Sequence, residues 1–242
     1  MPVTVTDYAR ALRSTLGRRS LKDAARGPLE RHATALIGAL PAVDLSRLTG
    51  AVTFDARVLP VDARHAWSLH APDQLVLQAI IAGRSVRTAF EIGTFNGGTT
   101  RLIAEALPED GRIWTLDLPP QSFDDTQKPQ GFQGSQVGAA YRGSPAEAKI
   151  EQILADSATF DPTPYTGRCD LVLVDGAHDY EHGVADTITA FELVAPGGLI
   201  LWDDFQPYWH GLIRGIIEAA GARRPRRLAG TSLGVWTAEL DG

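Results

Sequence analysis

Residues 86–100 read Val86-Arg-Thr-Ala-Phe-Glu91-Ile-Gly93-Thr-Phe-Asn-Gly97-Gly98-Thr99-Thr100, a buried-strand pattern that runs into a glycine-rich turn and then a helix. Glycine permits a tight turn and lets backbone amides approach a ligand where a Cβ would block them. The following helix offers free N–H groups at its N-terminus. This order predicts the ligand-binding end of a nucleotide-type α/β domain.

The spacing of the glycines argues against a dinucleotide ligand. The pyrophosphate fingerprint is G-x-G-x-x-G, whereas here Glu91 precedes Gly93 and the next glycine is Gly97. A carboxylate at the end of this strand would repel a pyrophosphate and attract a cation. S-adenosylmethionine carries an ammonium and a sulfonium group, so the acidic loop suits it. A tight turn without any ligand is the alternative interpretation.

Two further polar positions follow the next strand patterns. Asp117 ends the apolar run 112–117, roughly 20 residues after Gly97, where a carboxylate can accept both hydroxyls of a ribose. Asp156 and Ser157 follow the run 150–155. A water-exposed acid at a strand end is the alternative for Asp117, and an N-cap is an equally good interpretation of Asp156.

The alternation of strand and helix patterns predicts the fold class. We expect an α/β, doubly wound, Rossmann-like fold with a seven-stranded, mostly parallel sheet and an N-terminal helical extension. Residues 1–70 are expected to form an N-terminal helical cap that covers the pocket or makes a subunit contact, and residues 71–242 the ligand-binding domain. In the cap, Tyr8, Leu12 and Leu16 recur at helical spacing, which indicates an amphipathic helix. The expected strands lie near 86–91, 112–117, 150–155, 170–175, 197–202, 226–230 and 233–239.

Acidic residues follow two strands that the expected topology makes neighbours. Asp175 ends one apolar run, and Asp203 and Asp204 end the next. Three carboxylates at one sheet edge would raise one another's pKa unless a cation lay between them. Oxygen ligands favour Mg²⁺ or another hard divalent ion. The sequence therefore predicts a metal site formed by Asp175, Asp203 and Asp204.

Together these motifs resemble class I S-adenosylmethionine-dependent methyltransferases, and within them the divalent-metal O-methyltransferases related to catechol O-methyltransferase. In the catechol branch the last two acidic positions are usually Asp-Asn, and a lysine stands third after the first aspartate. This chain has Asp203-Asp204 and His178 there. The bacterial branch that acts on sugars and other natural products shares these features, so the departure counts against a catechol acceptor.

The resemblance implies a role for each part of the site. The methionine end of the cofactor would bind at Glu91 and the glycine loop, the ribose at Asp117, and the adenine at Asp156 with help from the Ser157 amide. The metal would hold a hydroxyl of a small-molecule acceptor. The expected cofactor-binding residues are Glu91, Gly93, Thr94, Asn96, Gly97, Asp117, Asp156 and Ser157.

His178 is the expected general base, and Asp175 is the second expected catalytic residue. An imidazole titrates near neutral pH and can take a proton from a metal-acidified hydroxyl. A histidine that only caps or packs a helix is the alternative. His178 and His182 also have the spacing of a zinc-binding pair, but no Glu follows His178, and the oxygen-rich acids favour Mg²⁺ over zinc.

Composition narrows the class of protein. The 242 residues are 44% hydrophobic, which is enough for a full core, and the net charge of −6 argues against a nucleic-acid partner. The N-terminus lacks a signal-peptide pattern, and no apolar run approaches the ~18 residues of a membrane span. A single cysteine, Cys169, excludes an internal disulfide and fits a cytoplasmic protein. A homo-oligomer is compatible with all of this.

Residues 118–149 form a long segment rich in Gln, Gly, Pro and Ser, which we expect to be a mobile lid over the site; a disordered loop is the alternative. Two other functions compete with the O-methyltransferase. An NAD-dependent oxidoreductase lacks support because the G-x-G-x-x-G spacing is missing. A non-catalytic S-adenosylmethionine-binding protein would have no need of three clustered acids.

Overall fold

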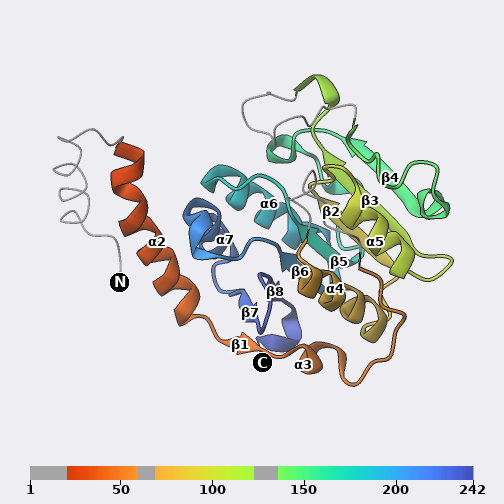
Figure 1. Cartoon of the computed structure of the whole chain (residues 1–242), viewed down its shortest axis with the longest axis horizontal. Coiled ribbons are helices and arrows are strands. Elements are labelled where there is room, and N and C mark those ends of the chain that lie inside the picture. The colour runs from red at the N-terminus through yellow and green to blue at the C-terminus, as the bar shows by residue number, and fades with distance from the viewer. Residues whose placement is uncertain (1–20, 59–68, 123–135, 242) are drawn as a thin grey trace.

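A computed structural model of the chain describes residues 21–58, 69–122 and 136–241, and these build one twisted sheet covered by helices (Figure 1). Within these residues the sheet has eight strands in the order β1-β7-β8-β6-β5-β2-β3-β4. β8 is antiparallel to both of its neighbours, and every other pairing is parallel. The strands are β1 (Ala42–Val43), β2 (Thr88–Ile92), β3 (Arg112–Asp117), β4 (Ile150–Leu154), β5 (Cys169–Val174), β6 (Val194–Trp202), β7 (Arg226–Leu228) and β8 (Gly234–Trp236).

Six α-helices lie in the described residues, joined by short 3₁₀ turns. From β2 the chain winds outward through β3 and β4, and it then returns to the other side of β2 to form β5 and β6. The strand order therefore reverses at β2, and ligands of open α/β sheets bind outside the carboxyl ends of the strands at such a point. The α-helices are α2 (Leu21–Ala39), α3 (Leu45–Thr49), α4 (Ala71–Gly83), α5 (Gly98–Ala106), α6 (Tyr180–Leu193) and α7 (His210–Ala220).

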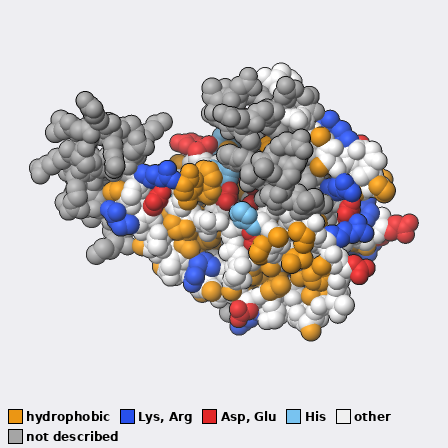
Figure 2. Space-filling model, viewed as in Figure 1, with side chains coloured by type: hydrophobic (Ala, Val, Ile, Leu, Met, Phe, Trp, Pro, Cys, Tyr) orange, Lys and Arg blue, Asp and Glu red, His pale blue; other side chains and the backbone are white. Residues whose placement is uncertain are grey.

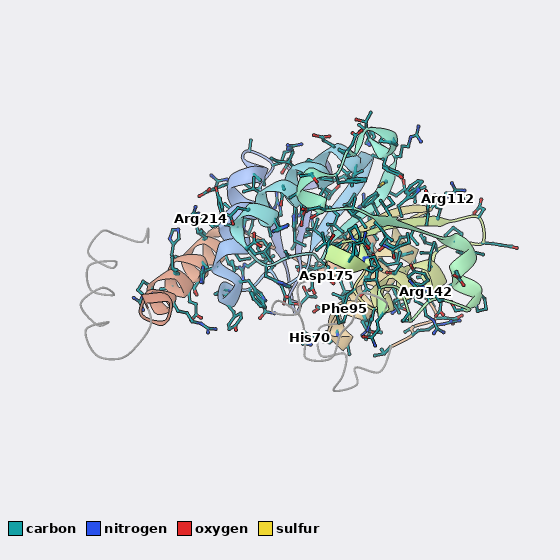
Figure 3. All side chains as sticks on the ribbon, turned by 90° about the horizontal axis from the view of Figure 1, so that it is seen from above. His70, Phe95, Arg112, Arg142, Asp175 and Arg214 are labelled. Carbon is teal, nitrogen blue, oxygen red and sulfur yellow. The ribbon has the colours of Figure 1, made fainter. Side chains whose placement is uncertain are left out.

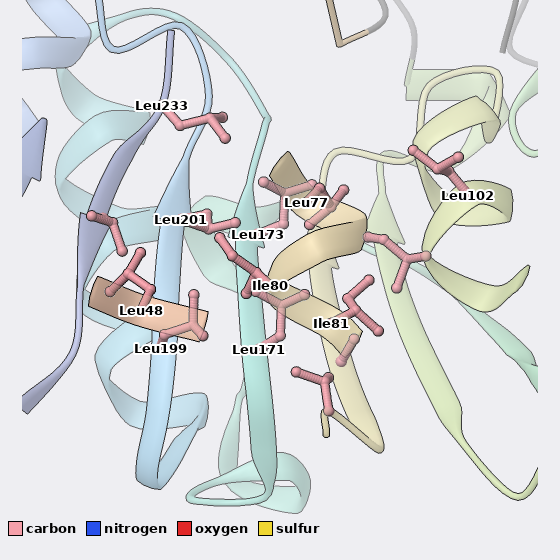
Figure 4. Packing of buried hydrophobic residues seen from close by; sticks show 14 of the residues in the cluster. Leu48, Leu77, Ile80, Ile81, Leu102, Leu171, Leu173, Leu199, Leu201 and Leu233 are labelled. Carbon is pink, nitrogen blue, oxygen red and sulfur yellow. The ribbon is translucent and has the colours of Figure 1, made fainter. Parts of the chain in front are cut away.

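The central strands are buried on both faces, which is why they read as continuous apolar runs. Side chains alternate along β5: Leu171 and Leu173 pack with α4 and α5 (Figure 4), whereas Val172 and Val174 belong to the cluster that includes α6 and α7. Leu77 and Ile80 of α4 have no exposed surface. The two clusters hold the sheet rigidly, so its carboxyl edge is a fixed platform for side chains.

The doubly wound, mostly parallel α/β fold is confirmed, with one more strand than expected. The additional strand is β1, whose two residues pair with β7 beside the C-terminal part of the chain (Figure 1). Two residues are too short for a period-two pattern. Helix α2 also runs through Pro28, a residue that local preference places at the start of a helix and not inside one. Proline inside a helix removes one N–H and crowds the carbonyl four residues earlier, and burial of Ala33 and Ile37 offsets this cost.

The N-terminal region packs directly on the rest of the chain. Ala33 and Ile37 of α2 share a cluster with Leu212 and Ile213 of α7. The division into a cap over 1–70 and a domain over 71–242 stays a prediction, and the expected helix around Tyr8, Leu12 and Leu16 lies outside the described residues. None of the helices in the described ranges has the length and apolar character that a bilayer crossing requires.

The predicted lid over residues 118–149 is only partly described. Residues 123–135 lie outside the described ranges, so the lid hypothesis stays a prediction for them. Residues 136–149 are packed against the molecule, since Val137, Tyr141 and Ala146 are buried. This second half of the segment is therefore part of the folded structure and not a free lid, because its apolar side chains have a partner in the glycine loop.

Candidate active site

The carboxyl ends of four neighbouring strands are tied together by backbone hydrogen bonds. The Gly93 amide donates to the Leu116 carbonyl (2.8 Å), the Asp175 amide to the Ile92 carbonyl (2.8 Å), and the Asp203 amide to the Val174 carbonyl (3.0 Å). These bonds bring the loops after β2, β5 and β6 to one edge, where Figure 3 labels Phe95 and Asp175. Acidic and histidine side chains gather on the face shown in Figure 2.

Gly93 and Gly97 are required by close packing. Gly93 has φ +103°, and a Cβ there would overlap the carbonyl oxygen of Asp175 and lie 2.5 Å from its carbonyl carbon. Gly97 has φ +82°, and its Cβ would lie 2.6 Å from Cδ1 of Tyr141. We predicted these glycines for the approach of a ligand. The structure shows that other parts of the protein already press against both positions, so their lack of a side chain serves the fold as well.

Glu91 is the most unusual acid of the site. It is fully buried, and its Oε2 accepts hydrogen bonds from Thr100 Oγ1 (2.5 Å) and Thr115 Oγ1 (2.6 Å). Its Oε1 is buried and has no hydrogen-bond partner among the described residues. Burial raises the pKa of Glu91 to about 7. An unsatisfied buried carboxylate oxygen is costly unless a ligand completes it, and a cationic group suits it best.

The other predicted loop residues hold the loop itself. Thr94 is buried and its hydroxyl lies 2.7 Å from that of Thr115. Asn96 Oδ1 accepts from the Gly98 amide (2.8 Å). Asp117 Oδ2 accepts from the Phe95 amide (2.6 Å) at the end of β3. Asp117 thus fixes the turn in which Phe95 adopts φ +49°. Because each carboxylate oxygen has two lone pairs, this bond is compatible with the predicted ribose role.

Asp156 and Ser157 stand at the end of β4, beside the end of β3. Asp156 is exposed and caps a short 3₁₀ turn, because its Oδ1 accepts from the Ala158 amide (2.9 Å). The N-cap interpretation of Asp156 is therefore seen in the structure. Ser157 lies near Asp186, a buried acid whose pKa burial raises to about 6. Contact of Asp156 or Ser157 with adenine stays a prediction.

Asp175, Asp203 and Asp204 lie close enough to affect one another's ionisation. The pKa of Asp175 is raised well above its ordinary range by burial and then by the charge of Asp203. Burial and the charge of Asp204 raise the pKa of Asp203 to about 7. Within the described ranges, however, no three His, Cys, Asp or Glu side chains are placed so that they could hold a metal ion. The acids fit a cation by charge, but they are not arranged as a finished metal centre.

His178 is paired with one of these acids. Its Nε2 lies 2.7 Å from Asp204 Oδ2, and its ring lies 4.2 Å from the Trp209 ring between centroids, at 31°. Asp204 adopts φ +51°, which directs the chain back after β6. This bond and the Trp209 ring fix the orientation of the imidazole. His182 instead bonds Asp179 through Nδ1 (2.8 Å), an arrangement that does not support a zinc pair with His178.

Sequence reasoning missed two residues beside Asp203. Ser232 Oγ donates to Asp73 Oδ2 (2.5 Å) and lies 3.3 Å from Asp203 Oδ1. Asp73 is a buried acid in the first turn of α4. An acid at the start of a helix is an ordinary dipole-favoured feature, and Ser232 lies between the expected strands 226–230 and 233–239. No sequence signal links these three residues.

Comparison with known families and proteins identifies relatives of this fold. Residues 90–205 match the model of a family described as a methyltransferase domain. The chain is 25% identical over 154 residues to caffeoyl-CoA O-methyltransferase 2 of Populus trichocarpa, a match that covers 62% of this chain and 58% of that protein. It is 26% identical over 156 residues to caffeoyl-CoA O-methyltransferase 1 of Nicotiana tabacum, covering 63% and 61% respectively. The chain thus spans about three fifths of the length of these curated relatives.

Solved structures share the fold at low sequence identity. The O-methyltransferase TomG of Streptomyces achromogenes, solved with S-adenosylmethionine, aligns with a TM-score of 0.54 and 18% identity over 87% of this chain and 96% of that one. An O-methyltransferase of Bacillus cereus, solved with S-adenosylhomocysteine, aligns with a TM-score of 0.52 and 16% identity over 96% of both chains. These alignments show that the chain shares its overall fold with both proteins.

Proposed function

We propose that this chain, whose residues 90–205 match the model of a methyltransferase domain, is a class I S-adenosylmethionine-dependent enzyme that transfers a methyl group from S-adenosylmethionine to a hydroxyl oxygen of a small molecule. One observation carries the choice of cofactor. Glu91 is a buried carboxylate at the switch point with one oxygen lacking a partner among the described residues. A cationic cofactor satisfies this oxygen, whereas the pyrophosphate of NAD would be repelled.

The cofactor would lie along the ends of β2, β3 and β4. Its ammonium group would bind near Glu91, its ribose at Asp117, and its adenine near Asp156 and Ser157. The loop of Gly93, Thr94, Asn96 and Gly97 would support it with backbone groups. The strands that carry these residues are adjacent and in fixed register, with Glu91 opposite Thr115 and Asp117 opposite Leu154.

His178 would remove the proton of the acceptor hydroxyl. In the transfer the acceptor O–CH₃ bond forms as the S–CH₃ bond breaks, and the hydroxyl proton passes to the imidazole. His178 Nε2 lies 2.7 Å from Asp204 Oδ2, so this carboxylate would hold the imidazole in place for the transfer. Asp204 would then stabilise the resulting imidazolium. A base held by a carboxylate partner is a recurrent catalytic arrangement.

A divalent cation, with Mg²⁺ as the first choice, would be held by Asp175, Asp203 and Asp204. When bound, such an ion lowers the pKa of an acceptor hydroxyl. The raised pKa values of Asp175 and Asp203 support this proposal, because a cation offsets the repulsion between the carboxylates. The bond from His178 occupies one oxygen of Asp204 and leaves the carboxylate's second oxygen for the ion.

Asp203→Asn tests the metal proposal. This variant should lose Mg²⁺-dependent turnover and the calorimetric signal of Mg²⁺ binding, while its affinity for S-adenosylhomocysteine stays within about twofold of wild type. Asparagine keeps an oxygen that can accept from Ser232 Oγ, which lies 3.3 Å from Asp203 Oδ1, so the surroundings of the site should stay folded. Full wild-type turnover in excess chelator would contradict the proposal.

The acceptor is proposed to be a sugar or another natural product. Asp203-Asp204 and His178 support this class against a catechol, while the curated relatives named above are caffeoyl-CoA O-methyltransferases. We also keep a homo-oligomer and a cytoplasmic location as predictions. Purified protein, S-adenosylmethionine and Mg²⁺ should be incubated with sugars, polyketide phenols, catechols and caffeoyl-CoA, with products measured by mass. Methylation of the last two alone would overturn the acceptor class.

Calorimetry tests the choice between this enzyme and the two alternatives. S-adenosylhomocysteine should bind wild-type protein more tightly than NAD does, and tighter binding of NAD would favour the oxidoreductase. Binding of S-adenosylhomocysteine with no methylated product from any acceptor of the panel would favour a non-catalytic S-adenosylmethionine-binding protein.

A further inference from the structure

Residues 138–141 contact the glycine loop through backbone hydrogen bonds and through the ring of Tyr141. The Gly138 amide donates to the Phe95 carbonyl (2.9 Å), and the Ala140 amide donates to the Asn96 carbonyl (2.8 Å). The Tyr141 ring occupies the space where a side chain on Gly97 would stand. Tyr141 itself is buried. This segment is distant from the loop in sequence, yet it clamps the turn that the cofactor requires.

A chain of side-chain hydrogen bonds leads from Tyr141 to Glu91. The Tyr141 hydroxyl donates to Gln152 Oε1 (2.7 Å), and Gln152 Nε2 donates to Thr94 Oγ1 (2.9 Å). Thr94 Oγ1 lies 2.7 Å from Thr115 Oγ1, which donates to Glu91 Oε2 (2.6 Å). The chain joins the clamping segment, β4, the glycine loop, β3 and β2, and it ends on the buried carboxylate.

Ionised Glu91 fixes the direction of every bond in this chain. A hydroxyl has one proton to donate. Thr115 gives its proton to Glu91, so the proton between the two threonines must come from Thr94. Thr94 then accepts from the amide of Gln152, whose carbonyl oxygen accepts from Tyr141. All donors point towards the carboxylate, and such aligned bonds strengthen one another.

We propose that Tyr141 is a positioning residue for the methionine end of the cofactor, acting through Gln152, Thr94 and Thr115 on the carboxylate of Glu91. The proposal rests on the function proposed above. The chain holds Oε2 on the protein side, which leaves Oε1 as the atom for the cofactor ammonium. Burial also raises the pKa of Tyr141 to about 12, so its hydroxyl remains a donor at neutral pH.

Tyr141→Phe tests this role, because it removes the first donor of the chain and keeps the ring against Gly97. Two ligands are titrated by calorimetry: S-adenosylhomocysteine and 5′-methylthioadenosine, which lacks the amino-acid part. We expect a threefold to tenfold weaker Kd for S-adenosylhomocysteine, roughly the value of one hydrogen bond. The Kd for 5′-methylthioadenosine should stay within about twofold, because that ligand does not reach Glu91.

Tyr165→Phe is the matched control, since the Tyr165 ring packs against Phe90 and Phe160 away from this chain. It should leave both affinities unchanged. A double-mutant cycle supplies a second, independent measurement with S-adenosylhomocysteine alone. In a Thr115→Val background, which breaks the chain next to Glu91, Tyr141→Phe should have no further effect.

The outcomes separate the two proposals. If wild-type protein does not bind S-adenosylhomocysteine, the proposed function fails. If it binds and Tyr141→Phe weakens both ligands equally, Tyr141 only packs the loop and the positioning role is overturned. Unchanged affinity for S-adenosylhomocysteine, or additive effects of the Tyr141 and Thr115 substitutions, would overturn it as well.

Discussion

Glu91→Gln should make the ligand-free protein more stable at pH 8 while weakening its affinity for S-adenosylhomocysteine. Glu91 is fully buried, and its pKa is raised from an ordinary value of 4.5 to about 7. The folded protein therefore binds this proton more tightly than the unfolded chain does. The contribution of Glu91 to the free energy of unfolding therefore falls as the pH rises from about 4.5 to 7, and it is constant above that range.

The expected magnitude follows from the two pKa values. A difference of one in pKa corresponds to about 1.4 kcal/mol, so ionising Glu91 in the folded state costs about 3 kcal/mol above pH 7. Glutamine keeps a carbonyl oxygen that can accept from Thr100 and Thr115 and carries no charge. We expect a gain of about 1–3 kcal/mol at pH 8. At pH 5 Glu91 is protonated in the folded protein and nearly isosteric with glutamine, so the difference should fall below about 1 kcal/mol.

Urea unfolding at pH 5 and pH 8, followed by tryptophan fluorescence, measures this effect. Glu192→Gln, at an exposed position, is the control and should change stability by less than about 0.5 kcal/mol at either pH. Asp203 titrates in the same range, but its contribution cancels in the difference between wild type and variant. A Glu91→Gln protein that is equally stable or less stable than wild type at pH 8 would refute the reasoning.

Further predictions concern the glycine loop and the base. Gly93→Ala should lower the melting temperature by several degrees more than Gly143→Ala. Both positions have positive φ, which costs a residue with a Cβ about 1–2 kcal/mol of stability. Only at Gly93 would the Cβ also clash with neighbouring backbone, whereas a Cβ at Gly143 would have nothing within 4 Å. Equal melting temperatures would show that the backbone at Asp175, just after β5, can shift to accommodate the added Cβ at little cost. His178→Ala should lower turnover about 10²- to 10⁴-fold with little change in S-adenosylhomocysteine affinity, and a near-normal rate would make His178 a structural residue.

Sequence patterns were sufficient for the elements whose surroundings impose a pattern. The expected strand at 112–117 matches β3, and β5 and β6 lie where apolar runs end in Asp175 and Asp203. The central parts of these strands are buried on both faces, so most of their positions are apolar until the chain leaves the sheet. The acids then fall at the edge because the next residue is the first one that can reach a ligand or water.

Patterns failed where an element is short or depends on a distant partner. β1 has only two residues, and it forms because these residues pair in parallel with β7. Local preference disfavours Pro28 inside a helix, but packing of α2 on α7 outweighs the lost N–H and the crowding of the proline ring. The loop after β3 was read as a lid because polar composition does not reveal that Tyr141 is buried against Gly97.

The sequence by itself determined the α/β class, the strand ends that carry Glu91, Asp117 and Asp175, and the sign of charge that the site prefers. Only the tertiary structure decided how those acids are held: Asp204 by His178, and Glu91 by a chain that starts at Tyr141. The physical reason is the sequence separation of the interacting residues. Burial constrains many residues of one strand and therefore produces a pattern in the sequence, whereas a hydrogen bond between two side chains far apart in the chain produces no such pattern.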